Sequence, residues 1–586
     1  MIPYVELFRK RIFPFAFAAA AILYLALFVA ILPHDSIWIS DEGNRVNAVR
    51  SYAETGEAFL PDPLAGLREV PEEGLRAYPP PYFVQNREGR WRSGYTAFFP
   101  WTASFLYRAA GQLGLILIPL AGGLLSILAA GWIAKELGMN ERNAACTMLL
   151  CAFGTPFLFY SGVFLEPTTA AFFATLGIWL ALRATASPKE PLYLLCAGVA
   201  CGISTLFREE GLILTAAVML ALAVTRFSWK RIGAFGAGAL LVLVPLMIFN
   251  HADSGSVFGL HAVVYSGLGE VRKYPFWIAK LRDYSMYLTL LSMPFPILNG
   301  LPAVLLIGGG IFCSWRKTAE YAEFVFYPLT VLACLFSTVY NIAANDSGRL
   351  IHQSLLDHLP LIAPCVFSLV LLFRESGRDV RFLAWCAAGV VLATPLLLNE
   401  EHVGIFWGGR HFITVIPVIC VLTVHLLASG KLSRMAKYGT AALIFASVAA
   451  NAAGYGFLLC KKTFSQDLVR TLNNPEVKTI VTDVFWLPEE LAWLPRDKRI
   501  IFMTKADSIE RVEALCRANG IAEFHTVLGL YFRVLSNDSV ARVFETNRTL
   551  PGRLFRNDRL KLFTVQIFRT VLSEPVSGKD KQAKKD

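Results

Sequence analysis

The chain has 586 residues, of which 55% are hydrophobic and 17% charged, and its mean hydropathy is +0.50. This composition excludes an ordinary water-soluble protein and favours a chain that crosses a membrane many times. The formal net charge of +11 lies mostly in short loops between apolar stretches and in the final segment SGKDKQAKKD, so it requires no nucleic-acid partner.

Apolar stretches approaching or exceeding ~18 residues, the length that crosses a bilayer as a helix, recur as far as residue 460. We therefore expect an all-α polytopic membrane protein with about 13 transmembrane helices. They are expected near 12–32, 112–134, 143–161, 167–184, 191–207, 211–225, 232–249, 297–313, 323–341, 359–373, 382–398, 412–428 and 438–458.

The expected inner loops are all basic, from the first group (Arg9, Lys10, Arg11) to the last (Lys431, Arg434, Lys437). The positive-inside rule then predicts a cytoplasmic N-terminus and an extracytoplasmic C-terminus. The first apolar run is longer than the ~7–15-residue core of a secretory signal and lacks a small-residue cleavage site, so it is expected to be a retained anchor. A bacterial inner membrane is the expected location.

The first outer loop, 33–111, is too long to be a simple connector. It begins with the adjacent acids Asp41 and Glu42, and the residues that follow have the spacing of an amphipathic helix lying along the membrane surface. A Pro-rich and aromatic-rich segment that contains Tyr95 comes next. The acidic pair also has a simpler explanation, because acids stabilise a helix N-terminus and Asp41 can pair with Arg45 one turn later.

Three further outer positions carry charges between apolar runs. Glu166 and Arg208 lie at the outer ends of spans, where each charge also suits its helix dipole. Arg410 and His411 precede a span whose N-terminal dipole disfavours cations, and two glycines stand before them. A basic pair there is better explained by a bound anion such as phosphate.

From residue 461 the composition becomes that of a soluble domain. VKTIVTDVFW and RIIFMTK are typical of strands, and ADSIERVEALCRANG predicts a helix that stops at Gly520. The predicted organisation is a membrane domain over 1–460, a small extracytoplasmic α/β domain over 461–573 and a basic disordered tail over 574–586. The α/β domain contains no metal-ligand spacing, phosphate loop or nucleophile elbow.

Acids and cations on one outer face suit transfer of a sugar whose leaving group is a lipid phosphate. An acid takes the proton of the acceptor hydroxyl, while cations neutralise the charge that grows on the phosphate. Two alternatives remain open: an outer-face polysaccharide polymerase or ligase that uses a diphosphate-linked donor, and a non-enzymatic lipid-glycan transporter. The spans contain almost no ionisable residues, which lowers the weight of the transporter.

The acidic pair after the first span, the long first loop and the C-terminal soluble domain resemble the GT-C superfamily of integral-membrane glycosyltransferases. The likeness is closest to the bacterial aminoarabinose transferases that modify lipid A and more distant to the protein O-mannosyltransferases. It covers most of 1–460 in layout. FWGGRHFITVIPVI is similar to a late-loop Trp-Gly-Arg segment of bacterial members, whereas the Lys-Pro that often follows the Tyr95 region is replaced by Phe99-Pro100.

The resemblance implies an inverting transferase with Asp41 as general base or as an acid that orients the acceptor or a metal. It implies catalytic roles for Asp41, Glu42 and Glu166, and donor-phosphate contacts from Arg45, Tyr95, Arg208, Arg410 and His411. Mg²⁺ or Mn²⁺ is compatible with Asp41 and Glu166 as ligands, although the sequence does not require a metal. The expected partners are a polyprenyl-phosphate sugar, membrane lipids and a lipid, glycan or protein acceptor.

Overall fold

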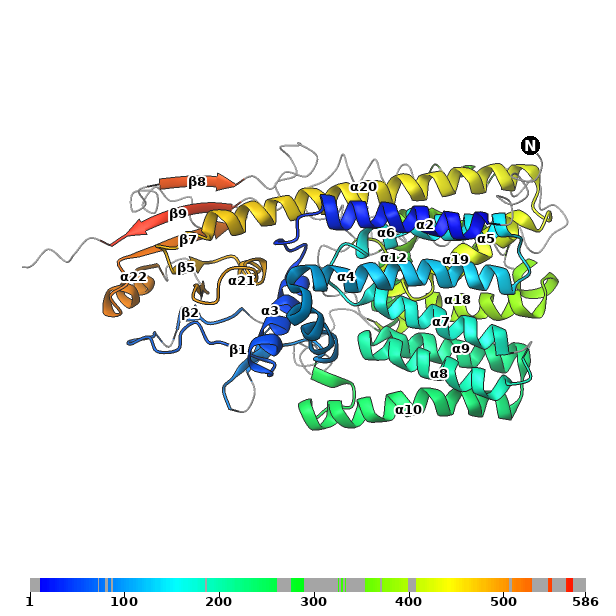
Figure 1. The fold of residues 1–586 in the computed structure, drawn as a ribbon, viewed down its shortest axis with the longest axis horizontal. Helices are drawn as coiled ribbons and strands as arrows, with labels where there is room; N and C mark the ends of the chain where they lie inside the picture. The colour runs from blue at the N-terminus through cyan, green and yellow to red at the C-terminus, as the bar shows by residue number, and fades with distance from the viewer. Residues whose placement is uncertain are drawn as a thin grey trace, which may run out of the picture. The chain divides into compact units, whose positions relative to one another are not determined.

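The structure is a computed structural model (Figure 1). It describes residues 11–71, 73–79, 83–85, 88–184, 187–260, 276–288, 354–368, 371–398, 407–504, 509–529, 546–550 and 565–572, together with the single positions 325, 328, 329 and 332. The chain divides into two compact units. Unit 1 contains Met1–His34 and Thr96–Leu458, and unit 2 contains Asp35–Tyr95 and Leu459–Asp586.

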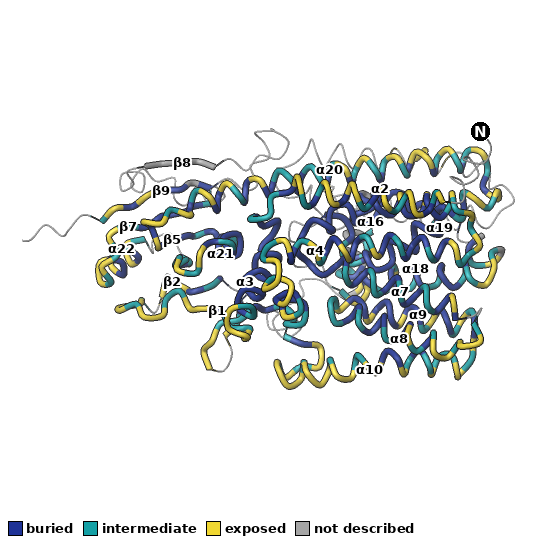
Figure 2. The backbone as a smooth tube through the Cα atoms, viewed as in Figure 1, coloured by how far each residue is buried: buried dark blue, intermediate teal, exposed yellow. Residues whose placement is uncertain are grey.

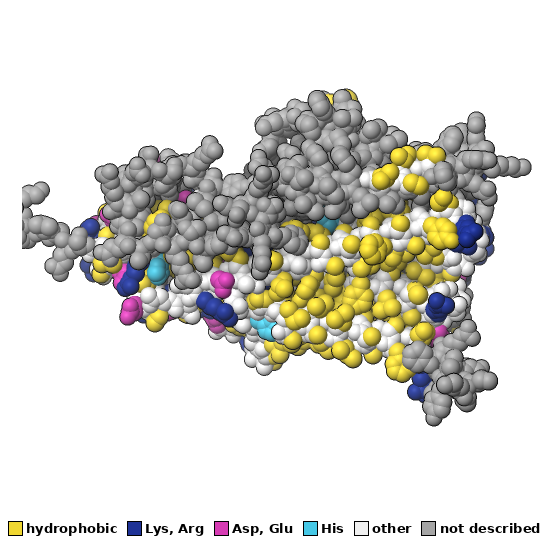
Figure 3. Space-filling model, turned by 90° about the horizontal axis from the view of Figure 1, so that it is seen from above, with side chains coloured by type: hydrophobic (Ala, Val, Ile, Leu, Met, Phe, Trp, Pro, Cys, Tyr) yellow, Lys and Arg dark blue, Asp and Glu magenta, His cyan; other side chains and the backbone are white. Residues whose placement is uncertain are grey.

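Unit 1 is a bundle of helices. Its longer described helices are α2 (Ile12–Leu25), α4 (Phe98–Glu136), α5 (Glu141–Phe153), α7 (Pro167–Ala184), α8 (Glu190–Phe207), α9 (Glu210–Arg226), α10 (Trp229–Ser254), α12 (Phe276–Leu288), α18 (Arg378–Leu397), α19 (Ile416–Ala428) and α20 (Arg434–Leu472), the last of which continues into unit 2. Six helical segments among the described residues are long and apolar enough to cross a membrane. Hydrophobic side chains gather on the face of this bundle that is seen in Figure 3, and together with these six segments they indicate an integral membrane protein.

Several expected spans match these helices closely. Helix α7 has the bounds expected for 167–184, and the short expected pair 191–207 and 211–225 corresponds to α8 and α9. Helix α4 has a break at Gly111, whose φ of 58° and ψ of −139° are not helical. The span expected from residue 112 therefore begins where the backbone returns to a regular helix.

Two expected spans are wrong in their continuity. The stretch 143–161 is divided into α5 and the four-residue α6 (Phe157–Tyr160), with Pro156 at the break. The stretch 359–373 is divided into a 3₁₀ turn (Pro360–Ile362), α17 (Ala363–Phe367) and a π segment (Leu371–Glu375). Proline lacks the N–H that a helix interior needs, which explains the break at Pro156. The expected span at 297–313 lies outside the described residues, and only positions 325, 328, 329 and 332 of the span at 323–341 are described, so the total of thirteen stays a prediction.

Glycines allow neighbouring helices of unit 1 to pack closely. A Cβ added at Gly198 of α8 would lie 2.0 Å from the carbonyl oxygen of Phe235 in α10, and one at Gly238 would lie 2.0 Å from the carbonyl oxygen of Leu195. Only a residue without a side chain fits at such positions, which is a common way for helices to associate in lipid.

Unit 2 is built around a six-stranded mixed sheet of order β2-β6-β5-β7-β9-β8. Its strands are β2 (Leu75–Arg76), β5 (Thr479–Thr482), β6 (Arg499–Met503), β7 (Glu523–Gly529), β8 (Thr546–Leu550) and β9 (Val565–Val571). β5 lies parallel to β6 and β7, whereas β2 from the first loop joins the edge antiparallel to β6. The predicted strands around 479 and 499 and the helix α22 (Ile509–Ala518), with Gly520 at a φ of 66°, are confirmed.

The first loop belongs structurally with the C-terminal segment. The sequence analysis assigned 33–111 to the membrane domain, but 35–95 forms one compact unit with the chain from 459 onward. This segment also contains β1 (Phe59–Leu60), β3 (Phe83–Gln85) and β4 (Trp91–Ser93), which form a second, antiparallel sheet of order β1-β4-β3.

The helix expected after the acidic pair is α3 (Ser40–Thr55), and it is confirmed. It is not an amphipathic surface helix, however, because Arg45, Asn47 and Arg50 on its polar side are buried like the apolar side (Figure 2). Arg50 donates to the carbonyl oxygens of Ala492 and, at 2.8 Å, Leu494. The polar side is therefore covered by the C-terminal segment of the same unit, a contact between residues more than 400 positions apart.

Candidate functional site

Three predicted residues lie together in unit 2 at the start of α3. Asp41 is in the first turn of the helix, which follows the extended residue Ile39, and it is only 8% exposed. The hydroxyl of Tyr95 donates to its carboxylate. Arg45, one turn further on, donates to the Asp41 carbonyl oxygen at 2.8 Å, and its guanidinium lies 4.3 Å from the centre of the Tyr95 ring. Asp41, Arg45 and Tyr95 thus form one connected group.

Glu42 has different surroundings from its neighbour Asp41. Its carboxylate accepts from the Trp38 backbone N–H at 2.5 Å and pairs with Lys462 at 2.9 Å. Both side chains of this pair are almost completely buried, with 2% and 5% exposure. The contacts hold the first turn of α3 against α20, whereas the sequence analysis grouped Glu42 with Asp41 as a catalytic acid.

A second buried ion pair lies beside this one. Lys461 contacts Glu490 of α21 (Leu487–Glu490) at 2.5 Å, and its ammonium also donates to the Ile37 carbonyl oxygen at 3.0 Å. Sequence reasoning missed both lysines and the α21 acids. A lysine at the end of an apolar helix is an ordinary interface anchor. The two adjacent lysines could therefore have been recognised only by matching them with two separate pairs of adjacent acids, Asp41-Glu42 and Glu489-Glu490.

The other predicted residues form a cluster in unit 1. Arg208, after the end of α8, donates from Nε to Glu210 at 3.0 Å, and its Nη1 lies 3.7 Å from the Glu166 carboxylate. All three side chains are buried, with less than a tenth of each exposed. The sequence analysis expected Arg208 to meet a lipid phosphate, but its partners in the structure are these two carboxylates.

Arg410 and His411 belong to the same cluster. They lie in a 3₁₀ turn (Arg410–Phe412) before α19; the His411 ring contacts the Glu210 carboxylate, and Arg410 Nε lies 3.3 Å from His411 Nε2. The anion beside His411 is therefore an acid of the chain itself. Glu210 was not predicted as a site residue, because an acid at the start of a span was explained by the helix dipole.

The two glycines before Arg410 do bring the backbone close to other residues, as expected. Gly408 has a φ of 61°, and a Cβ there would lie 2.9 Å from Pro156 and 3.0 Å from His358. Trp407 is buried and lies against His358, with ring centroids 4.6 Å apart. This packing fixes the segment that carries Arg410 and His411.

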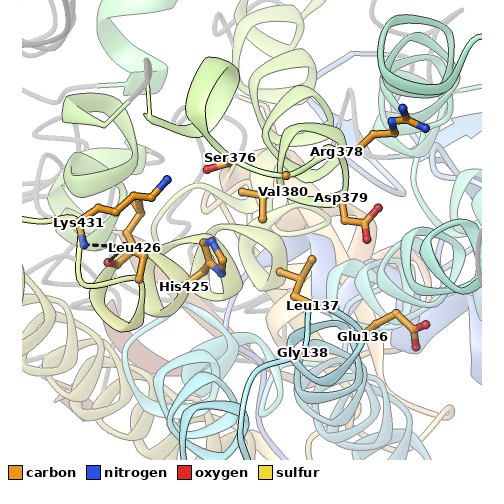
Figure 4. A pocket seen from close by; sticks show the side chains of 12 residues that line it. Glu136, Leu137, Gly138, Ser376, Arg378, Asp379, Val380, His425, Leu426 and Lys431 are labelled. Carbon is orange, nitrogen blue, oxygen red and sulfur yellow. Dashed lines mark hydrogen bonds between the residues drawn. The ribbon is translucent and has the colours of Figure 1, made fainter.

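A cavity of about 610 Å³ opens at the other end of α19, lined by Glu136, Arg378, Asp379, His425 and Lys431 among others (Figure 4). Asp379 is paired with Arg226, and Glu136 with Arg183. None of the predicted catalytic or phosphate-binding residues lines this cavity.

The metal site considered from the sequence, with Asp41 and Glu166 as ligands, stays a prediction. Over the described part of the chain, no group of three or more His, Cys, Asp or Glu side chains could hold a metal ion. Asp41 belongs to unit 2 and Glu166 to unit 1. Each cluster is described within its own unit, and their convergence at one site stays a prediction.

Comparison with known proteins gives a fold but no close relative. No family model matches the chain, and a search of curated proteins found no match. Among solved structures, ArnT from Cupriavidus metallidurans in the apo state is similar with a TM-score of 0.50 and 13% identity, covering 95% of this chain and 98% of that chain. For ArnT from Cupriavidus metallidurans bound to undecaprenyl phosphate, the TM-score is 0.49 and the identity 13%, and the match covers 95% of this chain and 98% of that chain. For the Archaeoglobus fulgidus oligosaccharyltransferase in the apo form, the TM-score is 0.47 and the identity 14%, and the match covers 89% of this chain and 70% of that chain.

ArnT is an aminoarabinose transferase, and its likeness to this chain extends over nearly the whole length of both proteins. At 13% identity the likeness concerns the fold alone. The resemblance inferred from the sequence is confirmed at that level: the chain shares its fold with ArnT, a GT-C glycosyltransferase.

Proposed function

We propose that the chain is a membrane glycosyltransferase that moves a sugar from a polyprenyl-phosphate-linked donor to an acceptor on the extracytoplasmic side, with inversion at the anomeric carbon. The observation that carries the proposal is the group at the start of α3. There a mostly buried carboxylate, Asp41, receives a hydrogen bond from Tyr95, and Arg45 lies against the Tyr95 ring. The GT-C fold supports the same function.

Asp41 acts as the general base. Its carboxylate takes the proton from the acceptor hydroxyl as that oxygen forms a bond to the anomeric carbon. The bond from this carbon to the phosphate oxygen breaks at the same time, and the lipid phosphate leaves with the bonding electrons. The leaving phosphodiester becomes a weakly basic phosphate monoester, so no general acid is needed. We assign Asp41 no role as a metal ligand.

The phosphate of the donor needs cations. Arg410 is our first candidate, because it is partly exposed and lies beside His411 in the turn before α19. Arg208 is engaged with Glu210 and Glu166. Its proposed role is to hold these acids in place and to contribute to the positive potential around the phosphate.

The test uses wild-type protein and Asp41→Asn in lipid nanodiscs with a panel of polyprenyl-phosphate and polyprenyl-diphosphate sugars. Mass spectrometry follows the lipid product, with water or added glycans as acceptor. The proposal expects release of polyprenyl phosphate by wild type and a loss of at least 10²-fold in Asp41→Asn. Glu54→Gln is the control, because Glu54 lies on the same helix but is largely exposed and should leave the rate unchanged.

The other outcomes refute the proposal in different ways. Release only from diphosphate donors indicates a polymerase or ligase. Movement of the intact lipid-linked sugar across the bilayer, undiminished in Asp41→Asn, indicates a transporter.

A further inference from the structure

Glu489 is a buried acid that the proposed mechanism does not yet use. It lies in α21 and is 0% exposed, and neither of its carboxyl oxygens has a hydrogen-bond partner among the described residues. Its neighbours differ in this respect. Glu490 is paired with Lys461, and Glu42 with Lys462. Buried polar groups nearly always have partners, so an unpaired carboxyl group requires an explanation.

The position of Glu489 is fixed by close contact with α3. A Cβ added at Gly43 would lie 2.0 Å from the Glu489 carbonyl oxygen and 3.0 Å from the Glu489 Cβ. Gly43 is two residues after Asp41, in the same helical turn. The Glu489 side chain therefore begins directly against the turn that carries the proposed base.

The surroundings of Glu489 favour its neutral form. An ionised carboxylate without a partner is very costly in a buried site, whereas a protonated one loses only the hydrogen bonds that it leaves unmade. Burial raises the pKa of Glu489 well above its ordinary value. Its own backbone N–H opposes this in part, and the negative charges of Asp41 on α3 and Glu490 on α21 add smaller increases. Tyr78 of the first loop also faces it, and the two lysines of α20 are engaged with the other acids.

We propose that Glu489 is a positioning residue for Asp41, which remains a neutral carboxylic acid while Asp41 acts as the base. This role rests on the proposed function. It leaves the negative charge of Asp41 beside the reacting hydroxyl without a second one from Glu489. If Glu489 ionised, two carboxylates would face each other at the first turn of α3, and the second charge would repel the departing lipid phosphate. The transfer rate should therefore fall on the alkaline side as Glu489 loses its proton.

The variant Glu489→Gln tests this role, because glutamine has the shape of the neutral acid but cannot ionise. At pH 7 its transfer rate should stay within about threefold of wild type. Over the alkaline range in which the wild-type rate falls about tenfold per pH unit, the rate of the variant should remain nearly constant. A residue with a purely structural role would change the rate without changing the shape of the pH profile.

Thermal unfolding provides a second readout that needs no donor. Between the ordinary pKa of a glutamate and the raised pKa of Glu489, the folded protein keeps a proton that the unfolded chain releases. Wild-type stability therefore falls as the pH rises through this range, and Glu489→Gln does not share that fall. The variant should unfold at the same temperature as wild type near pH 4 and at a higher temperature at pH 7 to 8. Glu490→Gln is the matched control and should unfold at a lower temperature at pH 7, because it leaves Lys461 without its partner.

The outcomes separate this inference from the proposed function. An active wild type whose alkaline limb is unchanged in Glu489→Gln overturns the role of Glu489 but not the transferase. Destabilisation of Glu489→Gln at pH 7, like that of Glu490→Gln, also overturns it, because the carboxylate would then be ionised and paired. A wild type inactive with every donor overturns the proposed function and this role with it, while the unfolding temperatures still report whether Glu489 holds a proton.

Discussion

The buried pair between Lys462 and Glu42 should hold the first turn of α3 in place. Lys462→Met keeps the length of the side chain but removes its charge, so the buried Glu42 carboxylate loses this ion pair while it keeps the hydrogen bond from the Trp38 N–H. Removing one partner of a buried pair typically costs ~3–5 kcal/mol. The free energy for opening α3 should fall by this amount.

Hydrogen exchange of the α3 amides in nanodiscs measures that free energy locally. At 1.4 kcal/mol for each tenfold change, exchange should become about 10²- to 10⁴-fold faster in Lys462→Met. The double variant with Glu42→Gln should recover most of the loss, because both charges are then absent. The control is Arg90→Met, whose pair with Glu57 is about half exposed and should contribute only ~0–1 kcal/mol. If Lys462→Met changes α3 exchange no more than Arg90→Met does, the pair does not hold the helix.

Three further predictions concern other parts of the molecule. Gly43→Ala places a Cβ 2.0 Å from the Glu489 carbonyl oxygen in α21, so it should lower the free energy of unfolding by ~1–3 kcal/mol and slow transfer. An unchanged free energy of unfolding would contradict the contact. Burial raises the pKa of Asp483 to about 6, so wild-type stability should fall as the pH rises from about 4 to about 6. Asp483→Asn should be more stable than wild type at pH 7, by at most ~3 kcal/mol, and no more stable at pH 3. Glu210→Gln removes the carboxylate that pairs with the buried Arg208 and should cost ~3–5 kcal/mol in unfolding experiments, whereas Glu209→Gln, at an exposed position, should change little.

The helices of unit 1 could be predicted because lipid imposes a length and an apolar composition on each span. Helix α7 shows this most clearly, with Pro167 at its start and Arg183 near its end. One error arose where an apolar stretch contained Pro156, because hydrophobicity alone does not report a break in the backbone. Strands β5 and β6 of unit 2 were also predictable from their β-branched residues, whereas the strands of the first loop were not predicted.

The candidate site was predictable only in part. The grouping of Asp41 with Arg45 follows from helical spacing, since the two residues are one turn apart. The polar side of α3 was expected at a surface, but contacts with residues more than 400 positions away bury it. The same holds for Glu489, whose contact with Gly43 depends on the C-terminal segment folding back onto the first loop. No local pattern in the sequence contains such a pairing.

The central claim is that Asp41 removes the proton from the acceptor hydroxyl. The most direct measurement is the single-turnover rate of sugar transfer by wild type and Asp41→Asn in nanodiscs, with the donor selected by the panel and the anomeric configuration of the product determined by NMR. The account predicts an inverted product and a rate at least 10²-fold lower in the variant. An equal rate in the two proteins, or a product with retained configuration, would contradict it.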